Sequence, residues 1–230
     1  MLSRIVLAAL AAGLLAGAFA TAAQTVRVIP LILAAEAYED EGAHSHEAHA
    51  EHAEAWAPSD GWERTFFTFI SNLVVGVAFS LLLTAAIMLI NQPVSLSTGL
   101  LWGAGGFAVF VLAPNFGLPP ELPGMAAGDL VARQIWWFAT VAMTAAGLLI
   151  FAFRRSIAWM LAGLALIVAP HVYGAPRPAS HESAVPAGLA ADFVMATIVT
   201  SALFWLVLGG LLGHFLSRAT RAEEALGKNG

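Results

Sequence analysis

Long apolar runs dominate the chain, and short polar segments separate them. A helix that crosses a bilayer needs about 20 mainly apolar residues. Six runs approach or exceed this length, and each is predicted to span a membrane: residues 5–23, 66–90, 94–114, 135–153, 157–172 and 189–216. The pattern predicts an all-α fold, a polytopic bundle of transmembrane helices that forms a single membrane domain over residues 1–230 and ends in a polar tail at 217–230.

The first apolar run has two interpretations. An apolar run behind a basic residue, followed by small side chains, is also the pattern of a cleaved signal peptide. Here the basic start is weak and apolar residues resume at Val28–Ala35, which favours a retained helix. Pro30 is expected to kink or end that helix. Gly13 and Gly17 form a GxxxG motif, which permits close contact with another helix.

Residues 36–64 form a long hydrophilic segment that permits helix but offers no apolar stripe for packing. It carries four histidines with carboxylates among and before them. Neutral imidazole is the commonest metal ligand and suits Co, Ni, Cu and Zn, while carboxylates add oxygen ligands and attract cations. The predicted metal ligands here are His44, His46, His49, His52, Glu36, Glu39, Glu47 and Glu51. The alternative is a solvated acidic linker whose histidines bind nothing.

Polar side chains at or near membrane depth are candidates for a cation pathway, because they are costly there and usually functional. His171 follows Pro170, where the fifth predicted helix must break, and we predict it as a further metal ligand together with His181 in the next loop. The remaining pathway candidates are Asn72, Asp129, Asp192 and His214. An interfacial position without a role in transport is the alternative for each of them.

The predicted connection at residues 115–133 is rich in proline, so we expect it to be stiff. Asp129 and Arg133 lie near its end, four residues apart. They are interpreted either as an i,i+4 ion pair on a helix or as part of a gate that leads toward the membrane.

Composition agrees with a membrane protein and narrows its function. Hydrophobic residues make up 59% of the chain and charged residues 11%, whereas about 25% are charged in a soluble domain. The chain has no cysteine, which excludes disulfides, zinc–thiolate sites and thiol catalysis. It also lacks a nucleotide-binding motif, a basic patch of the nucleic-acid type and any catalytic constellation. We therefore expect no enzyme, no cofactor, and no nucleotide or nucleic-acid partner.

Lysine and arginine in the short loops predict the orientation in the bilayer, because they concentrate on the cytoplasmic side. With the N-terminus in the cytoplasm, the inside holds most of them: Arg4, Arg154, Arg155, Arg218, Arg221 and Lys228. Both termini are then cytoplasmic in a bacterial inner membrane. The histidine-rich segment and the two proline-rich loops share the periplasmic face.

Several segments, in order, resemble one known family: PLILAAEAYED at 30–40, the histidine-rich segment, GLLWGAGGFAVFVLAPNFGLPPELPG at 99–124, DLVARQIWWFATVAMTAAGL at 129–148, and APHVYGAPRP at 169–178 followed by ALFWLVLGGLLG at 202–213. Together they resemble the CbtA family, the proposed cobalt transporter subunit associated with cobalamin synthesis. The resemblance covers nearly the whole chain. It implies cobalt uptake, about five spans, and a small single-span, histidine-containing partner, CbtB.

These observations lead to one hypothesis about function. The chain is expected to be a divalent-metal uptake subunit, with Co²⁺ as the transported ion. Its histidine- and glutamate-rich outer loop would capture the ion and feed it into the helix bundle, driven by the membrane potential. The alternative is a non-transporting membrane protein that binds metal as a sensor or buffer.

Overall fold

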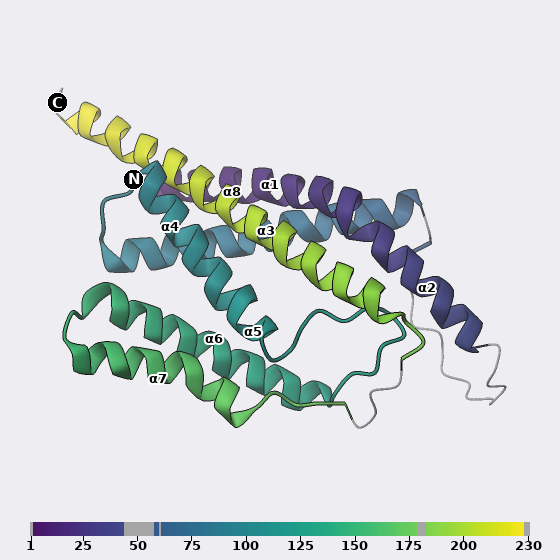
Figure 1. The fold of residues 1–230 in the computed structure, drawn as a ribbon. Helices are drawn as coiled ribbons and strands as arrows, with labels where there is room; N and C mark the ends of the chain where they lie inside the picture. Colours follow the sequence, from purple (N-terminus) through teal and green to yellow (C-terminus); the bar gives the residue numbers. More distant parts are fainter. Residues whose placement is uncertain (1, 44–57, 60, 179–182, 228–230) are drawn as a thin grey trace. The chain divides into compact units, whose positions relative to one another are not determined.

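The computed structural model describes residues 2–43, 58–59, 61–178 and 183–227, with only the backbone described at 39–43 and 222–227. The helices, shown in Figure 1, are α1 (Leu2–Arg27), α2 (Ile29–Ala43), α3 (Trp62–Ile90), α4 (Leu96–Phe107), the π-helical turn η1 (Ala108–Leu112), α5 (Ala113–Asn115), α6 (Leu130–Phe153), α7 (Ile157–Tyr173) and α8 (Ala187–Gly227). Since no strand occurs among these residues, the predicted all-α fold is confirmed.

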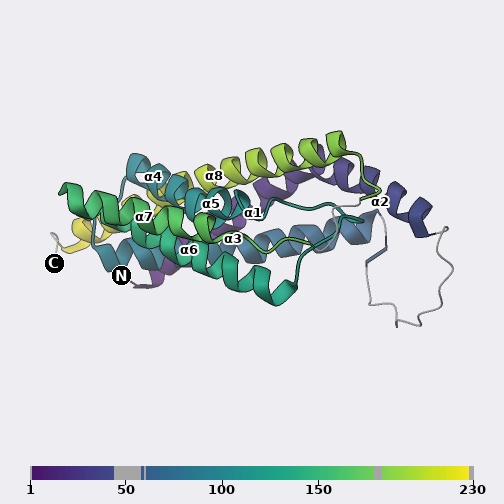
Figure 2. The ribbon, with the colours of Figure 1, turned by 60° about the horizontal axis from the view of Figure 1, so that its bottom comes forward.

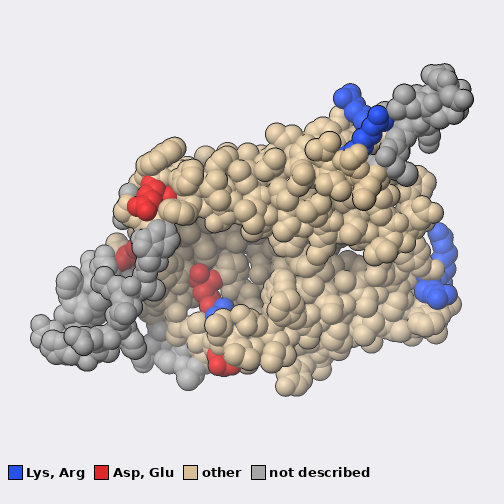
Figure 3. Space-filling view, turned by 180° about the vertical axis from the view of Figure 1, so that it is seen from behind, with Lys and Arg blue, Asp and Glu red and all other residues tan. Residues whose placement is uncertain are grey.

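Among the described residues, five helices are long and apolar enough to cross a membrane: Leu2–Arg27, Trp62–Ile90, Leu96–Asn115, Leu130–Phe153 and Ala187–Arg221. The predicted fifth span is helical as α7, but its 17 residues make it shorter than the others. Large apolar side chains are widely exposed, such as Leu89 at 86%, and charged groups cover only small patches of the face in Figure 3. Such a surface suits hydrocarbon contact, and the chain is a multi-pass membrane protein.

Two helices extend further into polar sequence than the apolar pattern indicates. α2 continues through Ala43, and α8 continues through Gly227. Alanine, glutamate and arginine in these stretches are good helix formers whatever their polarity. The apolar pattern therefore marks the part of a helix that suits the membrane and misses its polar end.

The chain divides into two compact units. The first contains α1, α3, most of α4 and the part of α8 from Thr200 onward. The second contains α2, η1, α5, α6, α7 and the part of α8 up to Val199. This division concerns internal packing, and the single membrane domain stays a prediction.

Close backbone contacts between glycines hold the helices of the first unit together. A Cβ added to Gly13 on α1 would lie 2.6 Å from the Cα of Val77 on α3. A Cβ added to Gly99 on α4 would likewise lie 2.6 Å from the Cα of Gly213 on α8. Real side chains do not tolerate such distances, so glycine is required at both crossings. The GxxxG motif of α1 thus makes the close contact with another helix that its spacing predicts.

In the second unit, α6 and α7 form an antiparallel hairpin and lie side by side in both ribbon views (Figures 1 and 2). Gly147 faces Ile167 across this hairpin, where an added Cβ would come within 2.6 Å of the isoleucine side chain. The π-helical turn η1 ends two residues before Pro114. Proline has no N–H, and its ring clashes with the carbonyl four residues earlier, which explains a widened turn there. Residues 116–129 follow and connect α5 to α6. We call this segment the proline-rich loop.

Candidate functional site

Most of the predicted metal ligands lie outside the described residues. These are His44, His46, His49, His52, Glu47, Glu51 and His181. Glu39 is described only as backbone within α2, and Glu36 is a half-buried residue of the same helix. Within the part of the chain that is described, no three histidine, cysteine, aspartate or glutamate residues are grouped so that they could hold a metal ion. Metal binding by the histidine-rich segment stays a prediction.

The helix that leads into this segment is firmly packed. Val28, Leu31, Ile32 and Ala35 recur at the spacing of one helical face. Val28 and Ala35 are buried in an apolar cluster of the second unit that also contains Leu122 of the proline-rich loop, Val185, Phe193 and Ala196. The sequence predicts a first helix that Pro30 kinks or ends, with apolar residues resuming at 28–35. In the structure most of this run belongs to a separate helix, α2, and packs it against the loop.

An ion pair fixes the proline-rich loop to the start of α6. Arg133 donates to the carboxylate of Glu121 at 2.7 Å, and each side chain is 24% exposed. Of the two interpretations of Asp129 and Arg133, the i,i+4 ion pair is therefore wrong, and the gate stays a prediction. Asp129 instead caps α6, where its Oδ1 accepts a hydrogen bond of 2.9 Å from the backbone N–H of Ala132. A carboxylate at that position serves the free N–H groups of the helix, which leaves Arg133 for Glu121.

A hollow of about 280 Å³ lies beside this ion pair, and we call it the loop hollow. Its wall combines the proline-rich loop, the segment after α7 and the first turns of α8, including Pro119, Glu121, Met125, Ser183 and Val194. Its possible metal-binding side chains are the carboxylate of Glu121, the thioether of Met125 and the hydroxyl of Ser183. This set is too small to hold a divalent ion in a closed site, since such ions take four or more ligands.

His171 lies in the last turn of α7, half-buried between two aromatic rings. Its ring centroid is 5.6 Å from that of Trp136 and 6.2 Å from that of Phe116, edge-on in both cases. The Trp136 Nε1–H donates to the carbonyl of Pro170 at 3.0 Å and so holds the end of α7 against α6. Among the described residues the imidazole makes ring contacts rather than hydrogen bonds. A role as metal ligand stays a prediction for this residue.

Each of the remaining pathway candidates is described within its own unit. Asn72 on α3 donates to Thr21 Oγ1 at 3.0 Å and to Gln24 Oε1 at 2.8 Å, both on α1. Its polar group is thus used to join two helices of the first unit. His214 belongs to the same unit and packs edge-on against Phe215. Asp192 is exposed on α8 in the second unit.

Sequence reasoning missed three residues that shape this region: Trp136, Pro170 as an acceptor, and Glu121. Trp136 lies at the start of the predicted span 135–153 and is only 5% exposed. Its neighbour Trp137 contacts Phe110, and the sequence does not distinguish the two adjacent tryptophans. The loop position opposite Trp136 is Gly117, where an added Cβ would lie 2.6 Å from the indole Cζ2. A glycine facing a large ring is a signal that only the fold makes visible.

Comparison with known proteins shows the family of this chain. The family model described as "Probable cobalt transporter subunit (CbtA)" matches residues 2–217, which is nearly the whole chain. No curated protein and no solved structure matches.

Proposed function

The chain belongs to the family of probable cobalt transporter subunits, CbtA, and from this premise we propose that it imports Co²⁺ across the bacterial inner membrane. The histidine-rich segment collects the ion on the periplasmic side. The loop hollow and His171 then receive the ion on its way to the helices. The family is one of transport rather than of catalysis, which agrees with the lack of a catalytic constellation in the sequence.

One observation carries the proposal: α2, which ends directly before the histidines, is packed onto the proline-rich loop. The buried contact of Val28 and Ala35 with Leu122 belongs to a cluster against which Met125 also packs. Met125 in turn lines the loop hollow next to Glu121. A segment that starts from this anchored helix releases its ion close to the unit that contains the hollow. There the carboxylate of Glu121, which also pairs with Arg133, offers oxygen ligands.

The orientation follows from the positive charges of the sequence. Arg154 and Arg155, between α6 and α7, would lie in the cytoplasm together with both chain termini. The proline-rich loop and the end of α7 are then periplasmic, since they lie at the opposite ends of α6 and α7. In this orientation the inside-negative membrane potential pulls the ion inward, because it is worth about 2.3 kcal/mol per elementary charge per 100 mV.

The family description names a subunit, which implies that the transporter has another subunit. We propose a small CbtB-like protein with one membrane helix and its own histidines. Such a partner would supply ligands that the described residues of this chain do not group together. Transport by the chain alone and transport with the partner are therefore separate measurements.

Uptake of radioactive cobalt by cells tests the capture step. The variant H44A/H46A/H49A/H52A is expected to lower uptake at limiting cobalt by at least about 10-fold, because a local cluster of ligands raises the rate of cation encounter by that order. At saturating cobalt the same variant is expected to approach wild-type uptake, since capture is then no longer limiting.

His171→Ala tests the step after capture. Loss of a pathway ligand at His171 is expected to lower uptake at both cobalt concentrations, because this step limits transport whatever the supply of ions. Wild-type uptake by the quadruple variant at limiting cobalt would remove the capture role. A quadruple variant that fails equally at all concentrations, with normal amounts in the membrane, would move these histidines from capture to the transport step itself.

A further inference from the structure

The turn that joins α6 and α7 places two positive charges side by side at the ends of two apolar helices. Arg154 and Arg155 follow Phe153 directly, and both side chains are exposed. Neither arginine forms an ion pair with an acidic residue in the part of the chain that is described. The helices that flank the turn expose Phe151 and Met160 at 39% and 50%. An unpaired cationic group thus lies next to an apolar surface.

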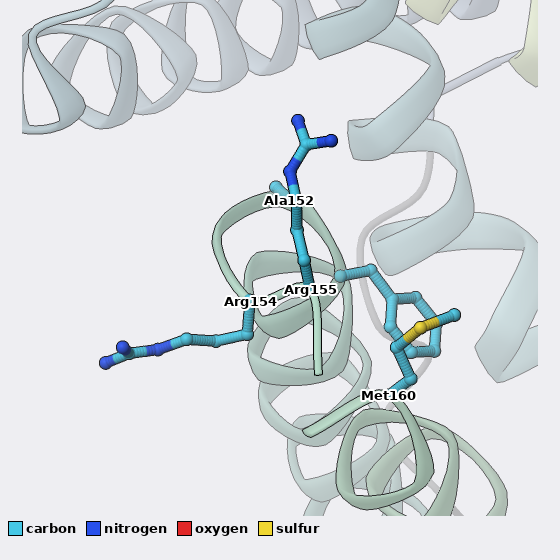
Figure 4. A pocket seen from close by; sticks show the side chains of 5 residues that line it. Ala152, Arg154, Arg155 and Met160 are labelled. Carbon is cyan, nitrogen blue, oxygen red and sulfur yellow. The ribbon is translucent and has the colours of Figure 1, made fainter. Parts of the chain in front are cut away.

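The turn also contains a hollow of about 470 Å³ that both arginines line together with Phe151, Ala152 and Met160 (Figure 4). In this view the two arginine side chains leave the turn in different directions, so they present separate guanidinium groups. The Cζ atom of Arg154 lies 5.3 Å from the centre of the Trp159 ring. This cation–π contact restrains Arg154, while the tryptophan ring suits the boundary between headgroups and hydrocarbon.

We propose that this turn is a binding site for anionic phospholipid, with the two guanidinium groups reaching lipid phosphates from separate sides of the turn and Phe151 and Met160 along an acyl chain. Arginine presents a planar set of donors that matches phosphate oxygens. The turn lies at the end of α6, which is long and apolar enough to cross a membrane, and at the start of the shorter apolar helix α7. It is therefore expected at the level of the headgroups. The proposal concerns the bilayer around the protein and is independent of the metal that is transported.

A lipid accounts for both halves of the surface, whereas free phosphate accounts for only one. Phosphate in solution would satisfy the arginines but would leave the apolar side chains of the hollow in water. An anionic lipid covers the apolar side chains and places its phosphate at the level of the turn. The structure therefore favours a headgroup that is attached to acyl chains.

Native mass spectrometry of the purified full chain in detergent tests the site, with phosphatidylglycerol and cardiolipin competed against phosphatidylethanolamine. The variant R154Q/R155Q is expected to lose its preference for the anionic lipids by about 25-fold, since each arginine near the surface contributes about 5-fold. R154K/R155K keeps the charge and is expected to keep most of the preference. R218Q/R221Q removes two arginines from α8, on the same predicted side of the membrane, and is expected to behave as wild type.

Several outcomes would overturn the proposal. One is an R154Q/R155Q variant that retains the anionic preference, and another is an equal loss in R218Q/R221Q, which would indicate a general charge effect. Binding of glycerophosphate, which has no acyl chain, as tightly as phosphatidylglycerol would replace the lipid by a free phosphate ester. Size-exclusion profiles and retained amounts of neutral lipid separate a loss of the site from a loss of folding, and the lysine variant gives a folded comparison.

Discussion

The ion pair between Glu121 and Arg133 joins the proline-rich loop to α6 through two side chains that are each 24% exposed. Partial burial makes removal of one partner costly, because the other charge stays poorly solvated. We expect Glu121→Gln and Arg133→Gln each to lower the free energy of unfolding by about 1–2 kcal/mol. The double variant is expected to cost less than the sum, with a coupling of about 1 kcal/mol, as measured by thermal or denaturant unfolding in detergent.

Asp129 is the matched control for these single and double variants of Glu121 and Arg133. Its four-residue spacing from Arg133 suggests an ion pair that the structure does not contain. Asp129→Asn retains the helix cap, since asparagine caps as well as aspartate, and is expected to be nearly neutral. Asp129→Ala removes the cap and is expected to cost about 1 kcal/mol. A coupling between Asp129 and Arg133 as large as that between Glu121 and Arg133 would contradict the assignment of the pair.

The same residues explain why the candidate site was only partly predictable. Local spacing points to Asp129 for Arg133, because four residues span one helical turn. The actual partner, Glu121, comes from a loop whose course proline and the apolar contact of Leu122 determine. His171 was singled out from its place after Pro170, where the helix was predicted to break. Instead α7 continues through Pro170 to Tyr173, and His171 lies in its last turn. The contact with Trp136 depends on how α7 folds back on α6, which no local pattern specifies.

The helix pairs of the first unit depend on glycines that face backbone. Gly76 on α3 faces the Gly13 carbonyl on α1, and an added Cβ would be closer than contact distance permits. Gly76→Ala is therefore expected to destabilise the protein by about 1–3 kcal/mol, despite the higher helix propensity of alanine.

Gly105 on α4 is the control, since an added Cβ there meets nothing within 4 Å. Gly105→Ala is expected to be neutral or to stabilise by up to about 1 kcal/mol. Both substitutions are made in the full chain and compared by thermal unfolding in the same detergent. Equal effects of the two would show that helix propensity, rather than close contact, governs these positions.

At the level of elements, apolar length predicts the helices well and their ends poorly. Residues 66–90 were expected as a span, and α3 includes four further residues at its start, from Trp62. The separate helix α2 was missed because Pro30 was expected to kink or end the first helix. Proline is also favourable in a first turn, where its missing N–H has no partner to lose. Here it begins a helix that the contact with Leu122 stabilises.

For the molecule as a whole, sequence is informative about class and family because both rest on properties that are distributed along the chain. An apolar surface is needed over every span, so composition alone indicates a membrane protein. The two-unit packing depends on particular crossings instead, such as Gly99 with Gly213. Those crossings cannot be read from one chain, because many of its apolar helices contain small residues at similar spacing.

The function itself is a property of the whole molecule, and a membrane potential gives it a quantitative signature. A divalent ion gains about 4.6 kcal/mol from an inside-negative potential of about 100 mV, which corresponds to accumulation of roughly a thousandfold at equilibrium. In liposomes that contain the chain, alone and with its CbtB-like partner, a potassium diffusion potential is expected to drive Co²⁺ accumulation that reverses when the potential is collapsed.

External acidification below about pH 6.5 should lower the rate of Co²⁺ uptake at limiting cobalt, because protonated imidazole cannot bind metal. Cobalt that binds in a fixed ratio to protein, whatever the potential, would establish a sensor or buffer and end the transport proposal. Competition by Ni²⁺ or Zn²⁺ at equal concentration would keep transport but remove the selectivity for cobalt, which the flexible chemistry of imidazole does not provide on its own.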